Sequence, residues 1–71
     1  MNTDIRIKLA KRVKELRIKN GITQEQLAEL TGMDYKHIQL LESKKPRAAR
    51  LDTIEKLAKA FKITPAQLLD F

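Results

Sequence analysis

The chain has 71 residues, 42% of them hydrophobic and 34% charged, with a formal net charge of +6. This balance is typical of one small folded domain that can meet a polyanion, and it excludes a disordered tail. With no cysteine, a single histidine and no long apolar run, the sequence excludes disulfides, a thiolate metal site and a membrane span, and we expect a cytoplasmic protein without cofactor, metal or catalytic activity.

The first element expected is a helix over residues 4–19. Asp4 can cap its start, and Asn20-Gly21 can end it because both residues tolerate the left-handed conformation. Its apolar face is formed by residues at spacings of three and four: Ile5, Leu9, Val13 and Leu16. The basic residues lie mostly off this face and are interpreted as a solvated surface, with DNA contact as the alternative: Lys8, Lys11, Arg12, Lys14 and Lys19.

Two short helices joined by a tight turn are expected next, over residues 24–31 and 34–42. Thr23 and Gln26 have the spacing of a capping box, and Gly32 stands where a left-handed residue commonly ends a helix. Asp34 can cap the second helix. The apolar faces are formed by Leu27, Ala28 and Thr31 and then by Ile38 and Leu41. A helix, a short turn with glycine and a second helix are typical of a helix-turn-helix.

A basic loop and two closing helices complete the chain. Residues 43–50 contain four basic side chains, and Pro46 prevents the preceding helix from continuing. A helix over about 51–61 has a core face at helical spacing, formed by Leu51, Ile54, Leu57, Ala58 and Phe61. Thr64 can cap a last helix over about 65–70, with Pro65 at its favoured first position. Either Leu68 or Phe71 is expected to stay exposed unless a homodimer covers it.

These elements closely resemble the Cro/CI-type helix-turn-helix family of phage and bacterial repressors, also called the XRE type. The matching residues run from about Leu9 to Leu69, nearly the whole chain. Inside the motif they are Gln24, Leu27-Ala28, Gly32, Ile38, Leu41 and Glu42. Outside it they are Val13, Leu16, Arg17, Gly21-Ile22-Thr23, Thr53, Ile54, Leu57-Ala58, Phe61, Ile63 and Leu68-Leu69. The resemblance implies a compact all-α, five-helix, lambda-repressor-like DNA-binding domain spanning residues 1–71, with its motif at about 23–42.

The resemblance also implies roles for three residues around the motif. Arg17 lies at the edge of an apolar face, where a partly desolvated guanidinium needs a carboxylate. In similar proteins the partner is the Glu that closes the recognition helix, so we expect an ion pair between Arg17 and Glu42. Gln24 is similar to the family's phosphate clamp, at a helix start whose free N–H groups also favour anions.

In this resemblance, the helix over 34–42 is the recognition helix that enters the major groove. Its base-reading candidates are Asp34, Tyr35, Lys36 and Gln39, with His37 and Leu40 beside them. Lys36 can donate to guanine O6 and N7, and Gln39 can pair with adenine N6 and N7. Tyr35 offers a ring to a thymine methyl and a hydroxyl to phosphate or base. For each of these side chains the alternative is a solvated helix face.

The loop after the recognition helix lies along the phosphate backbone in this family. The resemblance therefore makes Lys44, Lys45 and Arg47 phosphate-binding candidates, with Arg50 behind them, and the alternative is a solvated basic loop. The chain departs from the family pattern here, because Lys44 stands where a glycine is common and the loop is about one residue longer.

The sequence thus predicts a sequence-specific regulator that binds double-stranded DNA, repressor-like, as a homodimer on a palindromic operator. Two rival functions use the same fold. One is an antitoxin-type regulator that also holds a toxin. The other is a protein-interaction module that has lost DNA binding, in which Leu30, Leu40 and Phe71 would form an apolar patch.

Overall fold

The computed structural model describes residues 4–46 and 48–71, so the phosphate-binding prediction for Arg47 lies outside the described residues. Within the described ranges the chain forms five α-helices, and the all-α fold class is confirmed. The helices are α1 (Ile5–Lys19), α2 (Gln24–Thr31), α3 (Tyr35–Leu41), α4 (Leu51–Ala60) and α5 (Pro65–Leu68). Each helix that the sequence predicted is present, with ends that differ by one or two residues at most.

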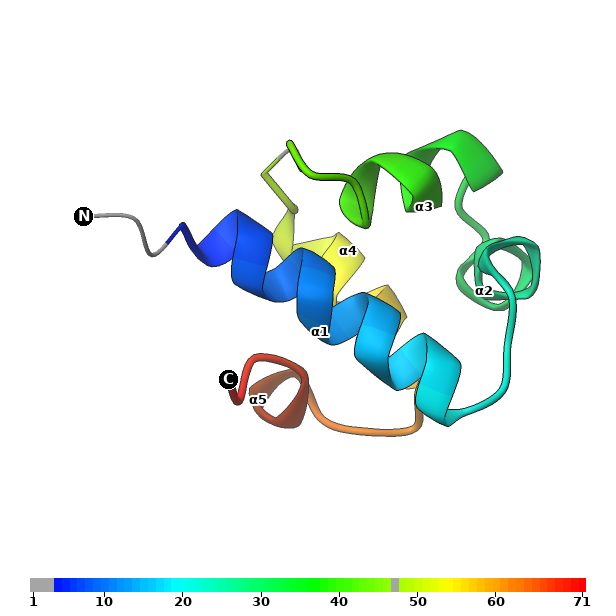
Figure 1. Ribbon diagram of the computed structural model, residues 1–71. Helices are drawn as coiled ribbons and strands as arrows, with labels where there is room; N and C mark the ends of the chain where they lie inside the picture. The colour runs from blue at the N-terminus through cyan, green and yellow to red at the C-terminus, as the bar shows by residue number, and fades with distance from the viewer. Residues whose placement is uncertain (1–3, 47) are drawn as a thin grey trace.

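One hydrophobic core joins all five helices. Each helix contributes one of the fully buried large side chains, which are Val13, Leu27, Ile38, Leu57 and Leu68. Burial of a side chain of this size stabilises the fold by roughly 1.5–3 kcal/mol. Figure 1 shows α1 crossing in front of α4, with α3 on one side of this pair and α5 on the other. This arrangement leaves one side of the short helix α3 facing outward.

Local hydrogen bonds fix the helix starts. The expected capping box is present at α2, where the Gln26 N–H donates to Thr23 Oγ1 at 3.0 Å and the Thr23 N–H donates to Gln26 Oε1 at 2.8 Å. The same arrangement joins Thr64 and Gln67 at α5. The cap expected from Asp34 is wrong, because its side chain makes no cap hydrogen bond. Asp34 is exposed, so water can satisfy the first N–H groups of α3 instead.

Two expectations about exposure need correction, and the predicted end of α1 at Asn20-Gly21 is confirmed. Leu51 was expected in the core but is 88% exposed, because helical side chains tilt toward the N-terminus and Leu51 is the first residue of α4. Ile5 is likewise 62% exposed at the start of α1. At the end of α1 only Gly21 takes the left-handed conformation, with φ +67°, whereas Asn20 has φ −88°.

The turn between α2 and α3 depends on Gly32, which has φ +72°. The Met33 N–H donates to the Ala28 carbonyl at 3.1 Å, the long hydrogen bond of a Schellman motif. A Cβ at Gly32 would meet no atom within 4 Å, so a substitution there is opposed by backbone strain alone.

We therefore expect Gly32→Ala to lower the free energy of unfolding by about 1–2 kcal/mol, the usual cost of the left-handed conformation for a residue with a Cβ. Urea denaturation measures the change. Gly32→Asn is the control, because asparagine adopts this conformation more readily and should cost less. Equal stability of Gly32→Ala and the original chain would contradict the assignment.

Candidate nucleic-acid interface

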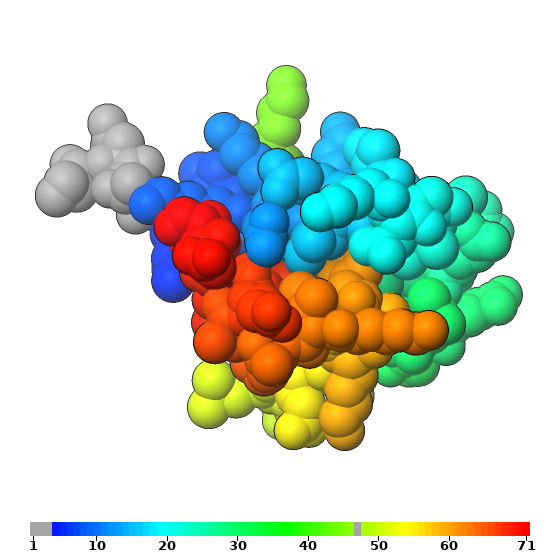
Figure 2. All heavy atoms as spheres, turned by 90° about the horizontal axis from the view of Figure 1, so that it is seen from below, coloured from blue at the N-terminus to red at the C-terminus, as the bar shows by residue number. Residues whose placement is uncertain are grey.

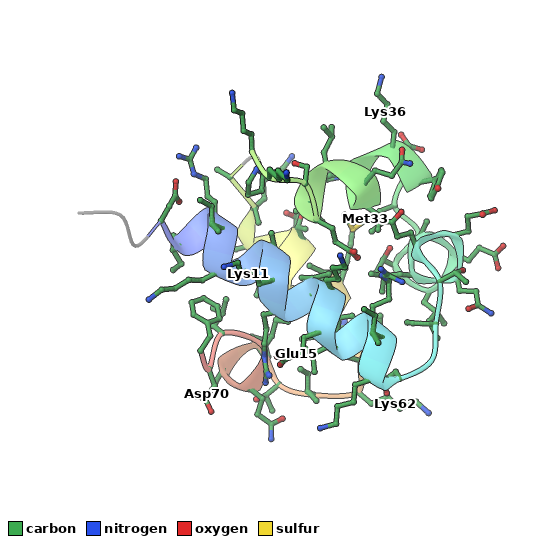
Figure 3. The ribbon with its side chains drawn as sticks, viewed as in Figure 1. Lys11, Glu15, Met33, Lys36, Lys62 and Asp70 are labelled. Carbon is green, nitrogen blue, oxygen red and sulfur yellow. The ribbon has the colours of Figure 1, made fainter. Side chains whose placement is uncertain are left out.

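The outward side of α3 presents the side chains that the sequence assigned to base reading. Ile38 and Leu41 of this helix are buried, with 0% and 3% exposure, and they hold it against the core. Tyr35, Lys36 and Gln39 are exposed, as is Asp34 just before the helix. Figure 3 shows Lys36 extending away from the body of the domain, at the edge formed by α3. The structure thus places three of the four base-reading candidates on the exposed side of α3 and the fourth, Asp34, directly before it.

The expected ion pair between Arg17 and Glu42 is present and ties α1 to the end of α3. Arg17 Nε lies 2.8 Å from Glu42 Oε2, and Arg17 Nη2 lies 3.0 Å from Oε1, so the pair is bidentate. The side chains are only 13% and 3% exposed. Arg17 Nη1 also donates to the Ile22 carbonyl at 3.0 Å, just before α2. One guanidinium therefore fixes α3 relative to the segment that leads into α2.

Gln24 joins this network, a contact that the sequence analysis missed. Its Nε2 donates to Glu42 Oε1 at 3.3 Å, and the residue is partly buried at the first position of α2. The phosphate-clamp candidate is thereby coupled to the end of α3. The sequence carries no local signal for this contact, because Gln24 and Glu42 meet only once α2 packs against the end of α3.

The loop after α3 carries the remaining phosphate-binding candidates. The Ser43 hydroxyl donates to the Leu40 carbonyl at 2.8 Å and ends the helix, and Pro46 is buried. Between them Lys44 and Lys45 are exposed. The loop is therefore anchored on both sides of its two lysines.

A groove of about 430 Å³ lies beside α3, on the side of α4. Three basic side chains line it: Lys36, His37 and Arg50. The Asp34 carboxylate also lines it, and Arg50 is within 3.3 Å of Asp52. His37 and Arg50, which the sequence analysis placed beside the main candidates, thus line the same groove as Lys36.

The apolar patch expected for a protein-interaction module is not formed as one surface. Phe71 lies at the start of α1, where the Lys8 ammonium stands 6.0 Å from its ring centroid, and Figure 2 shows the C-terminal residues against the first residues of α1. Leu30 belongs to α2, which follows the opposite end of α1, and Figure 1 shows the C-terminus and α2 at opposite ends of the molecule. Of the pair Leu68 and Phe71, Leu68 is buried and Phe71 is 47% exposed.

Two other kinds of site were searched for within residues 4–46 and 48–71. No helix among them combines the length and apolar character that crossing a membrane requires. Nor do these residues contain a group of three or more His, Asp or Glu side chains that could hold a metal ion.

The fold and this surface define a helix-turn-helix protein, and comparison with known proteins agrees. The helix-turn-helix family model matches residues 13–68, so the chain belongs to this family. It is a DNA-binding transcriptional regulator, and it acts by binding rather than by catalysis.

Individual relatives share most of the chain. It is 35% identical to the control protein C.BamHI of Bacillus amyloliquefaciens over 72 aligned positions, covering 100% of this chain and 88% of that protein. The restriction-modification controller protein C.AhdI of Aeromonas hydrophila has a similar structure, with a TM-score of 0.82, 38% identity and coverage of 89% and 94% of the two chains. The hypothetical transcription factor NHTF from Neisseria gives a TM-score of 0.85 and 35% identity, covering 93% of this chain and 75% of that one.

Proposed function

We propose that this chain is a controller-type regulator that binds a palindromic operator as a homodimer in the cytoplasm. The observation that carries the proposal is the exposed row of Tyr35, Lys36 and Gln39 on a helix whose opposite side is buried. Resemblance to C.BamHI and C.AhdI supports a role in controlling a restriction-modification system. A two-fold dimer would place two such helices in successive major grooves, about 34 Å apart.

In this proposal the side chains divide into two roles. Lys36 and Gln39 read base edges, together with Asp34 and Tyr35, because they project from the helix that enters the groove. Gln24, Lys44, Lys45 and Arg47 bind phosphates and set the docking angle. Arg17 and Glu42 touch no DNA, since each satisfies the other, and they hold α3 in place.

Loss of a phosphate contact should weaken binding to every DNA sequence by a similar factor. The slope of log Kobs against log salt is negative, and for Lys44→Gln or Lys45→Gln we expect it to become less steep by about 0.9, corresponding to one lost contact. Fluorescence anisotropy with the operator and with an unrelated duplex measures both slopes. A change confined to the operator would contradict the phosphate role and indicate base reading instead.

The dimer is supported by apolar surface beside the start of α4. A groove of about 200 Å³ is lined by Ile5, Leu9, Ala49, Ile54 and Leu69, and the 88% exposed Leu51 stands one helical turn before Ile54. We propose that this surface meets its counterpart in a second copy. Ala48 lines both this groove and the groove beside α3, so the proposed interface would lie close to α3 in each copy.

Sedimentation tests the dimer through Leu51→Glu. Because Leu51 is almost fully exposed, the substitution should leave the monomer folded. The molecular mass measured by sedimentation should fall from that of a dimer to that of a monomer. The matched control is Leu30→Glu, which changes a 59% exposed leucine on α2 and should leave the dimer intact. Dimerisation that survives Leu51→Glu would place the interface elsewhere.

A further inference from the structure

A groove runs between α1 and the loop that follows α3. One part, of about 260 Å³, is lined by Ile7, Ala10, Lys11, Lys14, Glu42 and Lys44. The next part, of about 380 Å³, is lined by Asp4, Arg6, Ile7, Lys44, Lys45 and Pro46. Ile7 and Lys44 line both parts, so the two form one continuous surface, here named the α1–loop groove. Figure 1 shows the loop after α3 lying alongside the first half of α1.

The charges of this groove are strongly unbalanced. Its two carboxylates are already paired, because Glu42 binds Arg17 at 2.8 Å and Asp4 binds Arg6 at 2.8 Å. The hydrogen bonds from the Arg6 side chain and backbone also lower the pKa of the Asp4 carboxyl, so it remains charged and bound to Arg6. Four lysines remain, which are Lys11, Lys14, Lys44 and Lys45. In the part of the chain that the structure describes, none of these four has a carboxylate within ion-pair distance.

Four ammonium groups along one groove repel one another, and a chain of anions would relieve that repulsion. Lys11 and Lys14 are three residues apart on α1 and therefore lie on one face, one turn from each other. Ile7, which is 39% exposed, lines the groove together with the lysines, so the surface is open and partly apolar. A nucleic-acid backbone has the repeating negative charge that such a row fits.

The position of the groove indicates which part of the DNA backbone it would bind. Glu42 caps the C-terminal end of α3, and Lys44 follows two residues later, so the groove begins where the recognition helix ends. Phosphates border the major groove on both sides of an inserted helix, and the major groove is about 12 Å wide. A strand that passes Lys44 at the end of α3 can therefore continue along α1.

We infer that Lys11 and Lys14 bind phosphates of the same DNA strand that contacts Lys44 and Lys45. The DNA-binding surface then extends beyond the helix-turn-helix onto α1, whose basic residues the sequence analysis interpreted as a solvated face. This inference rests on the proposed docking of α3 in the major groove. It assigns to α1 a share of the affinity and none of the base recognition.

The test compares two double variants that each remove two positive charges. Lys11→Gln/Lys14→Gln changes the groove, and Lys59→Gln/Lys62→Gln is the matched control. Figure 3 places Lys62 at the edge of the molecule opposite Lys36, and neither control residue lines the α1–loop groove. Glutamine has nearly the helix propensity of lysine, so α1 and the Lys59 position of α4 should remain helical. Lys62 follows α4 with φ +59°, a conformation that lysine and glutamine both adopt at a cost, so this exchange should change stability little, and circular dichroism checks that both variants are folded.

Anisotropy titrations of a duplex of about 20 base pairs, two helical turns, are made over a range of salt concentrations. For the groove variant we expect the negative slope of log Kobs against log salt to become less steep by about 1.8, for two lost contacts at about 0.9 each. The ratio of the binding constant of the original chain to that of the variant should then be about tenfold larger at 50 mM than at 200 mM salt. The control variant should keep the original slope.

A groove variant with the slope of the control would overturn the inference. Lys44→Gln separates this result from failure of the docking itself. If Lys44→Gln lowers the slope and the groove variant does not, the loop binds DNA and α1 does not. If the original chain does not bind duplex DNA, or if Lys44→Gln also has no effect, the proposed docking is wrong as well.

Discussion

Replacing Glu42 with alanine is expected to lower the free energy of unfolding by about 3 kcal/mol. The change leaves the Arg17 guanidinium, whose side chain is 13% exposed, with one carbonyl acceptor and no carboxylate. Removal of one partner from a buried pair costs about 3–5 kcal/mol, and the residual exposure of Arg17 places the value near the lower end. Because small domains are stable by only about 5 kcal/mol or slightly more, this would remove much of the stability.

Urea denaturation measures the effect, with Glu55→Ala as the control. Glu55 is an exposed carboxylate on α4, and its loss should change stability by about 0.5 kcal/mol at most. The double variant Arg17→Met/Glu42→Leu should recover much of the stability, because apolar replacement of a whole buried pair is often neutral. A loss of less than about 1 kcal/mol for Glu42→Ala would show that the pair is not a structural link between α1 and α3.

The second large effect is expected at the recognition helix. Lys36→Ala or Gln39→Ala should cost about 1–3 kcal/mol on the best operator and much less on operators already altered at the contacted base pair. The reason is that a bidentate contact to a base edge is worth this much only when the correct base is present. Both side chains are exposed, so neither substitution should affect folding.

Competition binding with operators substituted one base pair at a time measures this change. Lys44→Ala is the comparison, because it should weaken all of these operators about equally. Identical profiles for Lys36→Ala and Lys44→Ala would show that Lys36 binds backbone rather than bases. The proposed assignment of roles along α3 and the following loop would then be wrong.

The fold was predictable because the spacing of apolar residues in each helix indicates the face that is buried, and turn residues indicate where helices end. The spacing of Ile38 and Leu41 predicted which side of α3 is buried, and Gly32 predicted the turn before it. The need of Arg17 for a carboxylate was predictable from its place at the edge of an apolar face, and the resemblance to the Cro/CI-type family indicated that Glu42 supplies it. These features depend on short-range chemistry or on one strong electrostatic requirement.

Other features depend on how the helices pack and could not be predicted from spacing. Leu51 fits the helical period of α4, yet it lies beyond the core because it is the first residue of the helix. The contact from Gln24 to Glu42 and the α1–loop groove join residues far apart in sequence. Asp34 has the right type and position for a cap, but an exposed helix start does not require one.

The central claim, sequence-specific recognition by α3 in a two-fold dimer, is tested most directly by selection of bound sequences from a random duplex library at low and high salt. We predict one palindromic motif, with half-sites about one helical turn apart, that stays enriched at both salt concentrations. Phosphate contacts alone give binding without sequence preference that declines as salt rises. Recovery of no motif, with binding that only weakens at high salt, would contradict the assignment of Tyr35, Lys36 and Gln39 to base reading.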